Sequence, residues 1–204
     1  MPSLKSNKAL ESRIKEIYRL YIETVCPLVV QLELYDGSFP VEILIEIRGI
    51  LDHLAKSALS DSADEMERNV SKAESHVKMA LLDCFKYLCV SLDDRYRQFE
   101  ARYARAGLSA IEDGEFMRKV SEGRKDAAKK LLDARATDLG IGRGEAYEKY
   151  EAAFHAYSDV DDLLEDASGK AEKIKKRSRF NDWLVWISLG IGIAGVLVGV
   201  WGAF

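Results

Sequence analysis

The sequence predicts an all-α protein: an antiparallel bundle of long helices, followed by a long helix that continues into a single C-terminal transmembrane helix. The 204 residues include only 3 prolines and are rich in Ala, Leu, Glu, Lys and Arg, which favour helices. Apolar residues recur at spacings of three and four, and no stretch shows a strand signal. Charged residues make up 31% of the chain and the net charge is −4, so we expect an ordinary soluble surface over most of its length.

Four helices are expected before residue 140, and their ranges are 3–34, 41–59, 63–106 and 110–139. The first is expected to kink near Pro27, because proline lacks the amide hydrogen of a helical turn. Pro40 suits the first turn of the second helix. The third helix has apolar or small residues at spacings of 3, 4, 3 and 4, which predict a buried seam. These residues are Val70, Ala73, Val77, Ala80 and Cys84.

A glycine-containing segment, GIGRG at 140–144, separates the fourth helix from the fifth. A dinucleotide-binding loop or a P-loop would need a preceding strand, and the P-loop would also need a GK[ST] sequence. Neither feature is found, so we interpret this segment as a turn between helices. The fifth helix then carries small or apolar residues at spacings of 4 and 3 without interruption, which is typical of a coiled-coil seam. They are Ala146, Tyr150, Ala153, Tyr157, Val160, Leu164, Ala167, Ala171 and Ile174.

The same spacing continues into a stripe of small residues near the C-terminus: Ser188, Gly192, Gly195, Gly199 and Gly202. Small residues let helices approach closely in lipid, so the stripe predicts self-association of the protein in a membrane. The alternative is that the seam of the fifth helix packs against the fourth helix of its own chain.

The last 22 residues, 183–204, contain no charge and would form a helix of about 33 Å, which matches the hydrocarbon thickness of a bilayer. A basic segment that would face anionic lipid precedes them, with Lys173, Lys175, Lys176, Arg177 and Arg179. No signal peptide is recognisable at the N-terminus. We therefore expect a single-pass protein of the inner (cytoplasmic) membrane, with its N-terminal domain in the cytosol.

Three segments follow from these patterns. They are a cytosolic helical domain at 1–140, an amphipathic stalk helix with a basic juxtamembrane end at 143–182, and the transmembrane helix at 183–204. The three cysteines lie within helical patterns without a CxxC motif, which predicts reduced, buried thiols. The histidines lack the spacing of zinc ligands, and the sequence predicts neither a metal nor a cofactor.

Polar residues gather on the second and third helices. Arg48 and His53 are about 140° apart around the second helix, so they flank one polar face without stacking. Gly49 between them leaves room for another backbone to approach. The other candidate residues for a polar network or partner contact are Glu46, Asp52, His76, Asp83 and Lys86.

The Arg48-x4-His53 motif, within EIRGILDHLAKSA, resembles the Rx4–6H motif of the HEPN superfamily of all-helical domains. The resemblance covers residues 10–100. It implies a HEPN-like helical bundle whose dimers cleave RNA without metal, with Arg48 as phosphate clamp, His53 as acid/base and Glu46 as its orienting partner. In the ribonucleases of that superfamily the residue after the arginine is often polar, and here it is Gly49.

A structural role for the same residues is also possible. Arg48 and Asp52 could form an i, i+4 ion pair, which contributes only tenths of a kcal/mol. His53, His76 and Asp83 could satisfy one another between the second and third helices.

The favoured functional hypothesis is a tail-anchored effector that assembles through the glycine stripe and permeabilises the inner membrane in antiphage defence or abortive infection. This hypothesis follows a resemblance to the small HEPN-like membrane accessory proteins of type VI-B CRISPR systems. The alternative is a membrane-tethered HEPN-type ribonuclease toxin, and a third possibility is a scaffold without effector activity. The partners expected are the membrane, further copies of the chain, and RNA or a defence-system protein.

Overall fold

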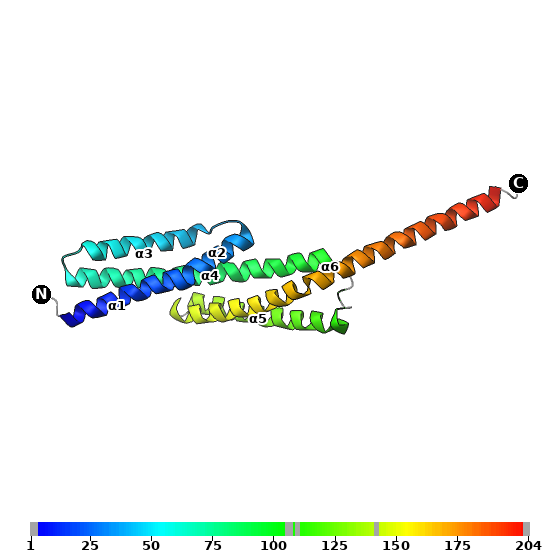
Figure 1. The fold of residues 1–204 in the computed structure, drawn as a ribbon. Coiled ribbons are helices and arrows are strands. Elements are labelled where there is room, and N and C mark those ends of the chain that lie inside the picture. The colour runs from blue at the N-terminus through cyan, green and yellow to red at the C-terminus, as the bar shows by residue number, and fades with distance from the viewer. Residues whose placement is uncertain (1–3, 105–107, 109–110, 141–142, 202–204) are drawn as a thin grey trace. The chain divides into compact units, whose positions relative to one another are not determined.

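The all-α prediction is confirmed in the computed structural model, which describes residues 4–104, 108, 111–140 and 143–201 (Figure 1). Helices account for nearly all of these residues, and no strand occurs among them. The elements in chain order are α1 (Leu4–Leu20), a π-helical turn η1 (Tyr21–Val25), α2 (Cys26–Asp36), α3 (Val41–Leu59), α4 (Ala63–Tyr103), a 3-10 turn η3 (Glu112–Gly114), α5 (Glu115–Gly140) and α6 (Arg143–Trp201).

The first predicted helix, which was expected to be a single kinked helix, is formed in the structure by three successive elements, α1, η1 and α2. The amide of Cys26 donates to the carbonyl of Tyr21 across the wide turn, and Pro27 follows in the first turn of α2, where its missing amide hydrogen is tolerated. The segment ends at Gly37, whose φ of 64° is the left-handed conformation that favours glycine, and the Gly37 amide donates to Glu33 at 2.9 Å.

The chain divides into two compact units, of which the first comprises Met1–Asp94 and Arg124–Ser158. Within it, α3 runs antiparallel to the first half of α4 after a short turn, and α1 lies along the same part of α4 (Figure 1). The predicted seam from Val70 to Cys84 is buried in this core together with Ile17, Leu32 and Ile43. Arg13 binds Glu67 and Glu74, which joins α1 to α4 at the surface.

The second unit comprises Arg95–Gly123 and Asp159–Phe204. Its core combines the end of α4, the start of α5 and α6. An added Cβ at Gly123 would lie 2.9 Å from a methyl group of Val160, so the glycine permits α5 to approach α6 closely. Arg95 of α4 and Asp161 of α6 form an ion pair at 2.8 Å in this unit.

The seam of the fifth predicted helix lies on α6 and is buried by its own chain. The positions from Ala146 to Ala171 therefore pack within one chain, which was the alternative expected from the sequence. Each of these positions is buried in the core of the unit to which it belongs. Ile174 is partly buried in the core of the second unit.

The membrane predictions need correction. In the part of the chain that the structure describes, no helix combines the length and the apolar character needed to cross a membrane. Such a crossing requires about 20 consecutive, mainly apolar residues, whereas along α6, where its side chains are described, charged residues recur from Glu148 to Arg177. The predictions of a transmembrane helix at 183–204 and of a single-pass inner-membrane location are therefore wrong.

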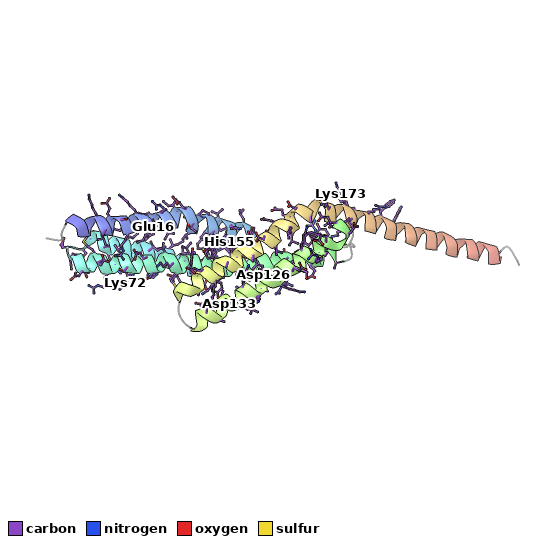
Figure 2. The ribbon with its side chains drawn as sticks, turned by 90° about the horizontal axis from the view of Figure 1, so that it is seen from below. Glu16, Lys72, Asp126, Asp133, His155 and Lys173 are labelled. Carbon is purple, nitrogen blue, oxygen red and sulfur yellow. The ribbon has the colours of Figure 1, made fainter. Side chains whose placement is uncertain are left out.

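The basic residues that were expected to face lipid have other surroundings in the structure. Lys173 is exposed on α6 (Figure 2), and the ammonium of Lys175 lies over the ring of Tyr103, 5.4 Å from its centroid. Lys176 and Arg177 are exposed, and the side chain of Arg179 lies outside the described part. Of the predicted stripe, Ser188, Gly192, Gly195 and Gly199 belong to α6 in a stretch without described side chains, and Gly202 lies outside the described residues.

Candidate functional site

Two histidines from neighbouring helices stack on each other in the first unit. The ring centroids of His53 on α3 and His76 on α4 are 5.3 Å apart, with 20° between the ring planes. Gly49 makes room for this arrangement, because an added Cβ there would lie only 2.7 Å from Cε1 and Nδ1 of His76. The space expected to admit another backbone at Gly49 is therefore filled by an imidazole.

Each ring is held by one nitrogen. Nδ1 of His76 is 2.7 Å from Oε2 of Glu46, and Nδ1 of His53 is 3.0 Å from Oδ1 of Asn69. The Asn69 amide is oriented in turn, because its Nδ2 donates to the carbonyl of Glu65 at 2.9 Å. Since both partners present oxygen acceptors, Nδ1 of each imidazole carries the proton and donates.

The second nitrogen of each ring is open. Within the described residues, neither Nε2 atom makes a hydrogen bond, and both histidines are only half-buried. In the neutral imidazole, a protonated Nδ1 leaves a lone pair on Nε2, which can accept a proton. The arrangement therefore presents two oriented proton carriers side by side, one anchored by a carboxylate and the other by a neutral amide.

A groove adjoins this histidine pair at the turn between α3 and α4. Its volume is about 450 Å³, and it is lined by Lys56, Leu59, Ser60, Glu65, Arg68, Asn69 and Lys72. Asn69 belongs to both places, because it lines the groove and binds His53. Lys72 lies on the first half of α4 (Figure 2) and is exposed.

Arg48 does not join the histidines. It is exposed on α3 among the exposed side chains of Leu44, Ile45 and Leu51, and in the described structure it forms no ion pair or hydrogen bond. The expected Arg48–Asp52 pair is replaced by Lys56–Asp52 at 2.5 Å.

The pKa of Asp52 reflects its pairing with Lys56. The hydrogen bond from Lys56 lowers the pKa of Asp52, and the charges of His53 and Arg48 act in the same direction.

The expected trio of Arg48, His53 and Glu46 is thus divided between two sides of α3. Glu46, expected to orient His53, binds His76 instead.

Asp83 and Lys86 belong to another cluster. Nζ of Lys86 is 2.8 Å from Asp138 of α5 and 3.8 Å from Asp83, and it also lies over the ring of Tyr150, 5.3 Å from the centroid. Burial raises the pKa of Asp83, and the nearby charge of Lys86 opposes this shift. Asp83 makes no hydrogen bond to either histidine among the described residues, so the expected network of His53, His76 and Asp83 is not formed.

Two residues of the candidate site were absent from the sequence-based candidates. Asn69 and Lys72 precede His76 on α4 at spacings of 3 and 4, so all three lie on one side of the helix. The same pattern occurs on α3, where Gly49, His53 and Lys56 are spaced 4 and 3. Together the two patterns could have indicated that two polar faces meet.

The thiols take no part in the site. Cys84 and Cys89 are buried, and burial raises the pKa of each to about 12. Such thiols are protonated and unreactive at neutral pH. Across the described ranges, no group of three His, Cys, Asp or Glu side chains is arranged to hold a metal ion.

Comparison of the chain with family models, with curated proteins and with solved structures finds no match. The resemblance to the HEPN superfamily therefore rests on the residues of the second and third predicted helices alone.

Proposed function

We propose that this chain is a HEPN-like RNA-cleaving protein in which His53 and His76 act as the general base and the general acid. The observation that supports this proposal is the stacked pair itself: each imidazole is oriented through Nδ1 and leaves Nε2 open. Two such groups are what the transesterification of an RNA phosphodiester requires, because one proton must be removed and another supplied. An antiviral role, as the resemblance implies, would then be exerted on RNA.

The roles differ because the anchors differ. In the proposed reaction, Nε2 of neutral His53 takes the proton of a ribose 2′-hydroxyl, whose oxygen attacks the adjacent phosphorus. The bond from phosphorus to the 5′-oxygen breaks, and protonated His76 gives its Nε2 proton to that oxygen. The products are a 2′,3′-cyclic phosphate and a 5′-hydroxyl. We assign the acid to His76 because its Nδ1 binds the carboxylate of Glu46, whereas Nδ1 of His53 binds the amide oxygen of Asn69.

The test is cleavage of a short single-stranded RNA by purified protein. His53→Gln and His76→Gln should each lower the cleavage rate by about a hundredfold or more. His155→Gln is the matched control, because His155 is exposed on α6 (Figure 2) and its ring lies beside that of Phe154, with the centroids 5.3 Å apart. Intact RNA with the wild-type protein, or equal rates in all three variants, would show the proposal to be wrong.

A second candidate function, self-association, is favoured by an exposed apolar surface in the first unit. Large apolar side chains are exposed on α1, η1, α2 and α3, and Leu34 and Leu59 are the most exposed, at 78% and 86%. The full set is Tyr18, Ile22, Val30, Leu34, Val41, Leu44, Ile45, Leu51 and Leu59. Surfaces of this kind mark interaction sites in soluble proteins. We propose that a second copy of this chain covers the part of this surface on α3 that is formed by Leu44, Ile45 and Leu51.

Charge complementarity favours a second copy as the occupant. Arg48 stands within the apolar stripe of α3 without an ion pair in the described structure, and Asp52 is exposed one turn further on. If two copies of α3 pack antiparallel about a two-fold axis midway between Arg48 and Asp52, each Arg48 faces Asp52 of the other copy. A two-fold interface repeats this contact twice. A small apolar hollow of about 160 Å³, with Ile22 and Leu51 in its lining, lies on the same surface.

The molar mass of the protein in solution tests this assembly. Arg48→Asp and Asp52→Arg should each raise the dimer dissociation constant, and the double exchange should restore it, because the pair then re-forms with reversed charge. Leu51→Glu should raise it by about a hundredfold. Leu132→Glu on α5 is the control, because Leu132 is equally exposed but lies away from this stripe. A monomeric wild-type protein would exclude the dimer without affecting the ribonuclease proposal.

A further inference from the structure

The groove at the turn between α3 and α4 has a charge opposite to that of the chain. Its lining includes three cations (Lys56, Arg68 and Lys72) against one carboxylate (Glu65), whereas the chain as a whole carries a net charge of −4. A hollow of about 450 Å³ is within the usual size of a site for a small ligand or one unit of a polymer. This local excess of positive charge favours an anionic ligand.

Two of the three cations are available to a ligand. Lys56 is bound by Asp52 at 2.5 Å, whereas Arg68 and Lys72 form no ion pair among the residues that the structure describes. Glu65 accepts a hydrogen bond from the hydroxyl of Ser60 at 3.0 Å and keeps its negative charge, because the hydroxyl is neutral. The groove therefore offers two unpaired cations against one carboxylate.

Two other acidic residues of α4 are paired with a cation outside the groove. Glu67 and Glu74 lie on the side of α4 that faces α1, and Arg13 binds both carboxylates, with Nε 2.7 Å from Glu74. The hydrogen bond from Arg13 lowers the pKa of Glu74. Arg13 thus pairs with the carboxylates on this side of α4, and these carboxylates do not pair with Arg68 or Lys72 in the groove.

The position of the groove indicates what it holds. Asn69 forms part of its wall and also anchors His53, so a polymer whose scissile bond lies at the histidines would extend into the groove. Leu59, 86% exposed, supplies an apolar surface at its rim, and no aromatic residue lines it. Such a lining suits a phosphate backbone and offers no aromatic ring on which a base could stack.

We infer that this groove binds the phosphate backbone of single-stranded RNA next to the cleaved bond, with Arg68 and Lys72 as the phosphate-binding residues. The inference rests on the proposed function, because it names the substrate of the same site. A single strand is required because the 2′-oxygen must reach a position in line with the leaving 5′-oxygen, and a base-paired A-form helix holds it away from that position. Groove contacts to phosphate carry no sequence information, so the site accepts many sequences.

The experiment measures binding of a labelled single-stranded RNA whose 2′-hydroxyls are methylated, so that it cannot be cleaved. The wild-type protein, Arg68→Glu, Lys72→Glu and the double variant are compared over a series of salt concentrations. Each single change should weaken binding, and the slope of log K against log salt should fall by about 0.7 for each phosphate that the variant no longer binds. Lys129→Glu is the matched control, because Lys129 is an exposed lysine on α5 without an ion pair in the described structure, and it should bind RNA like the wild type.

The possible outcomes separate this inference from the proposed function. Equal affinity and equal salt slopes for wild type and the double variant would overturn the inference, and cleavage of unmethylated RNA would still support the ribonuclease. Binding that depends on Arg68 and Lys72 without any cleavage would support the groove and refute the ribonuclease. Tighter binding of a hairpin duplex than of the single strand would overturn the assignment of the substrate. Unchanged circular dichroism and melting temperature would show that the variants are folded.

Discussion

Two polar clusters lie on α4 about three turns apart, and they differ in how completely their members are bound. Lys86 is held by Asp138, Asp83 and the ring of Tyr150, so its charge is used within the fold. His76 and its neighbour His53 each use one ring nitrogen and leave the other open. The first cluster joins helices, whereas the second leaves two ring nitrogens open to a ligand. Incomplete hydrogen bonding, more than burial or charge, distinguishes a candidate site from a structural network.

The largest expected effect concerns the Lys86 cluster. Lys86→Met keeps the aliphatic stem but leaves Asp83 and Asp138 without their cation, so we expect the free energy of unfolding to fall by about 2–3 kcal/mol. Urea denaturation measures this loss. Lys130→Met breaks the exposed pair with Asp126 and should change stability by less than about 0.5 kcal/mol. Equal effects of the two substitutions would mean that the Lys86 cluster does not stabilise the fold.

A smaller effect on stability, but a large one on activity, is expected at Gly49. Gly49→Ala gains about 1 kcal/mol of helix propensity, but the new methyl group must displace the His76 ring. We expect a net stability change within about 1 kcal/mol and a loss of RNA cleavage of about a hundredfold.

Gly169→Ala is the control for this prediction. Nothing lies within 4 Å of a Cβ at Gly169, so the substitution should stabilise the protein without affecting cleavage. If the Gly49→Ala variant cleaves RNA as fast as the wild type, the position of the His76 ring does not affect catalysis.

The smallest expected effects are pH dependences of opposite sign. Burial raises the pKa of Asp83 above 3.8, so its ionisation destabilises the fold progressively as the pH rises through the folded pKa. Arg13 lowers the pKa of Glu74 below 4.5, so its stabilisation is present above that value and is lost as the pH falls through the folded pKa. As the pH rises from 3 to 7, Asp83→Asn should gain stability relative to wild type and Glu74→Gln should lose it, each by less than about 1 kcal/mol.

Urea denaturation of both variants and of the wild type across this pH range measures the two differences. Parallel stability profiles for the two variants would contradict the opposite signs.

Much of the fold followed from the spacing of apolar residues. The predicted helix at 41–59 has the bounds of α3, and the seam from Val70 to Cys84 is buried as expected. Periodicity gives the face on which a residue lies, but not which helix packs against that face. For that reason Glu46 could be placed near the histidines, whereas its binding to His76 could not be foreseen. Asn69 was missed because its role depends on a residue of another helix.

The prediction for the last segment failed for a different reason. It used apolar character, length and the basic residues that precede the segment, and no helix in the described part of the protein has both the length and the apolar character for crossing a membrane. The 4 and 3 spacing on α6 was a correct observation about buried positions, but it could not tell a seam within one chain from a seam between chains.

The wide turn at Tyr21–Val25 determines how much variation in length the first helical segment tolerates. Ile17 and Val25 are both buried although they are eight residues apart, a separation that would rotate them by about 80° in a regular α-helix. The extra residue in the π-helical turn absorbs this rotation. A chain shortened by one residue between Tyr21 and Val25 would form an unbroken α-helix there and still direct both residues into the core, so this turn is the place where the segment can lose a residue without exchanging its inner and outer faces.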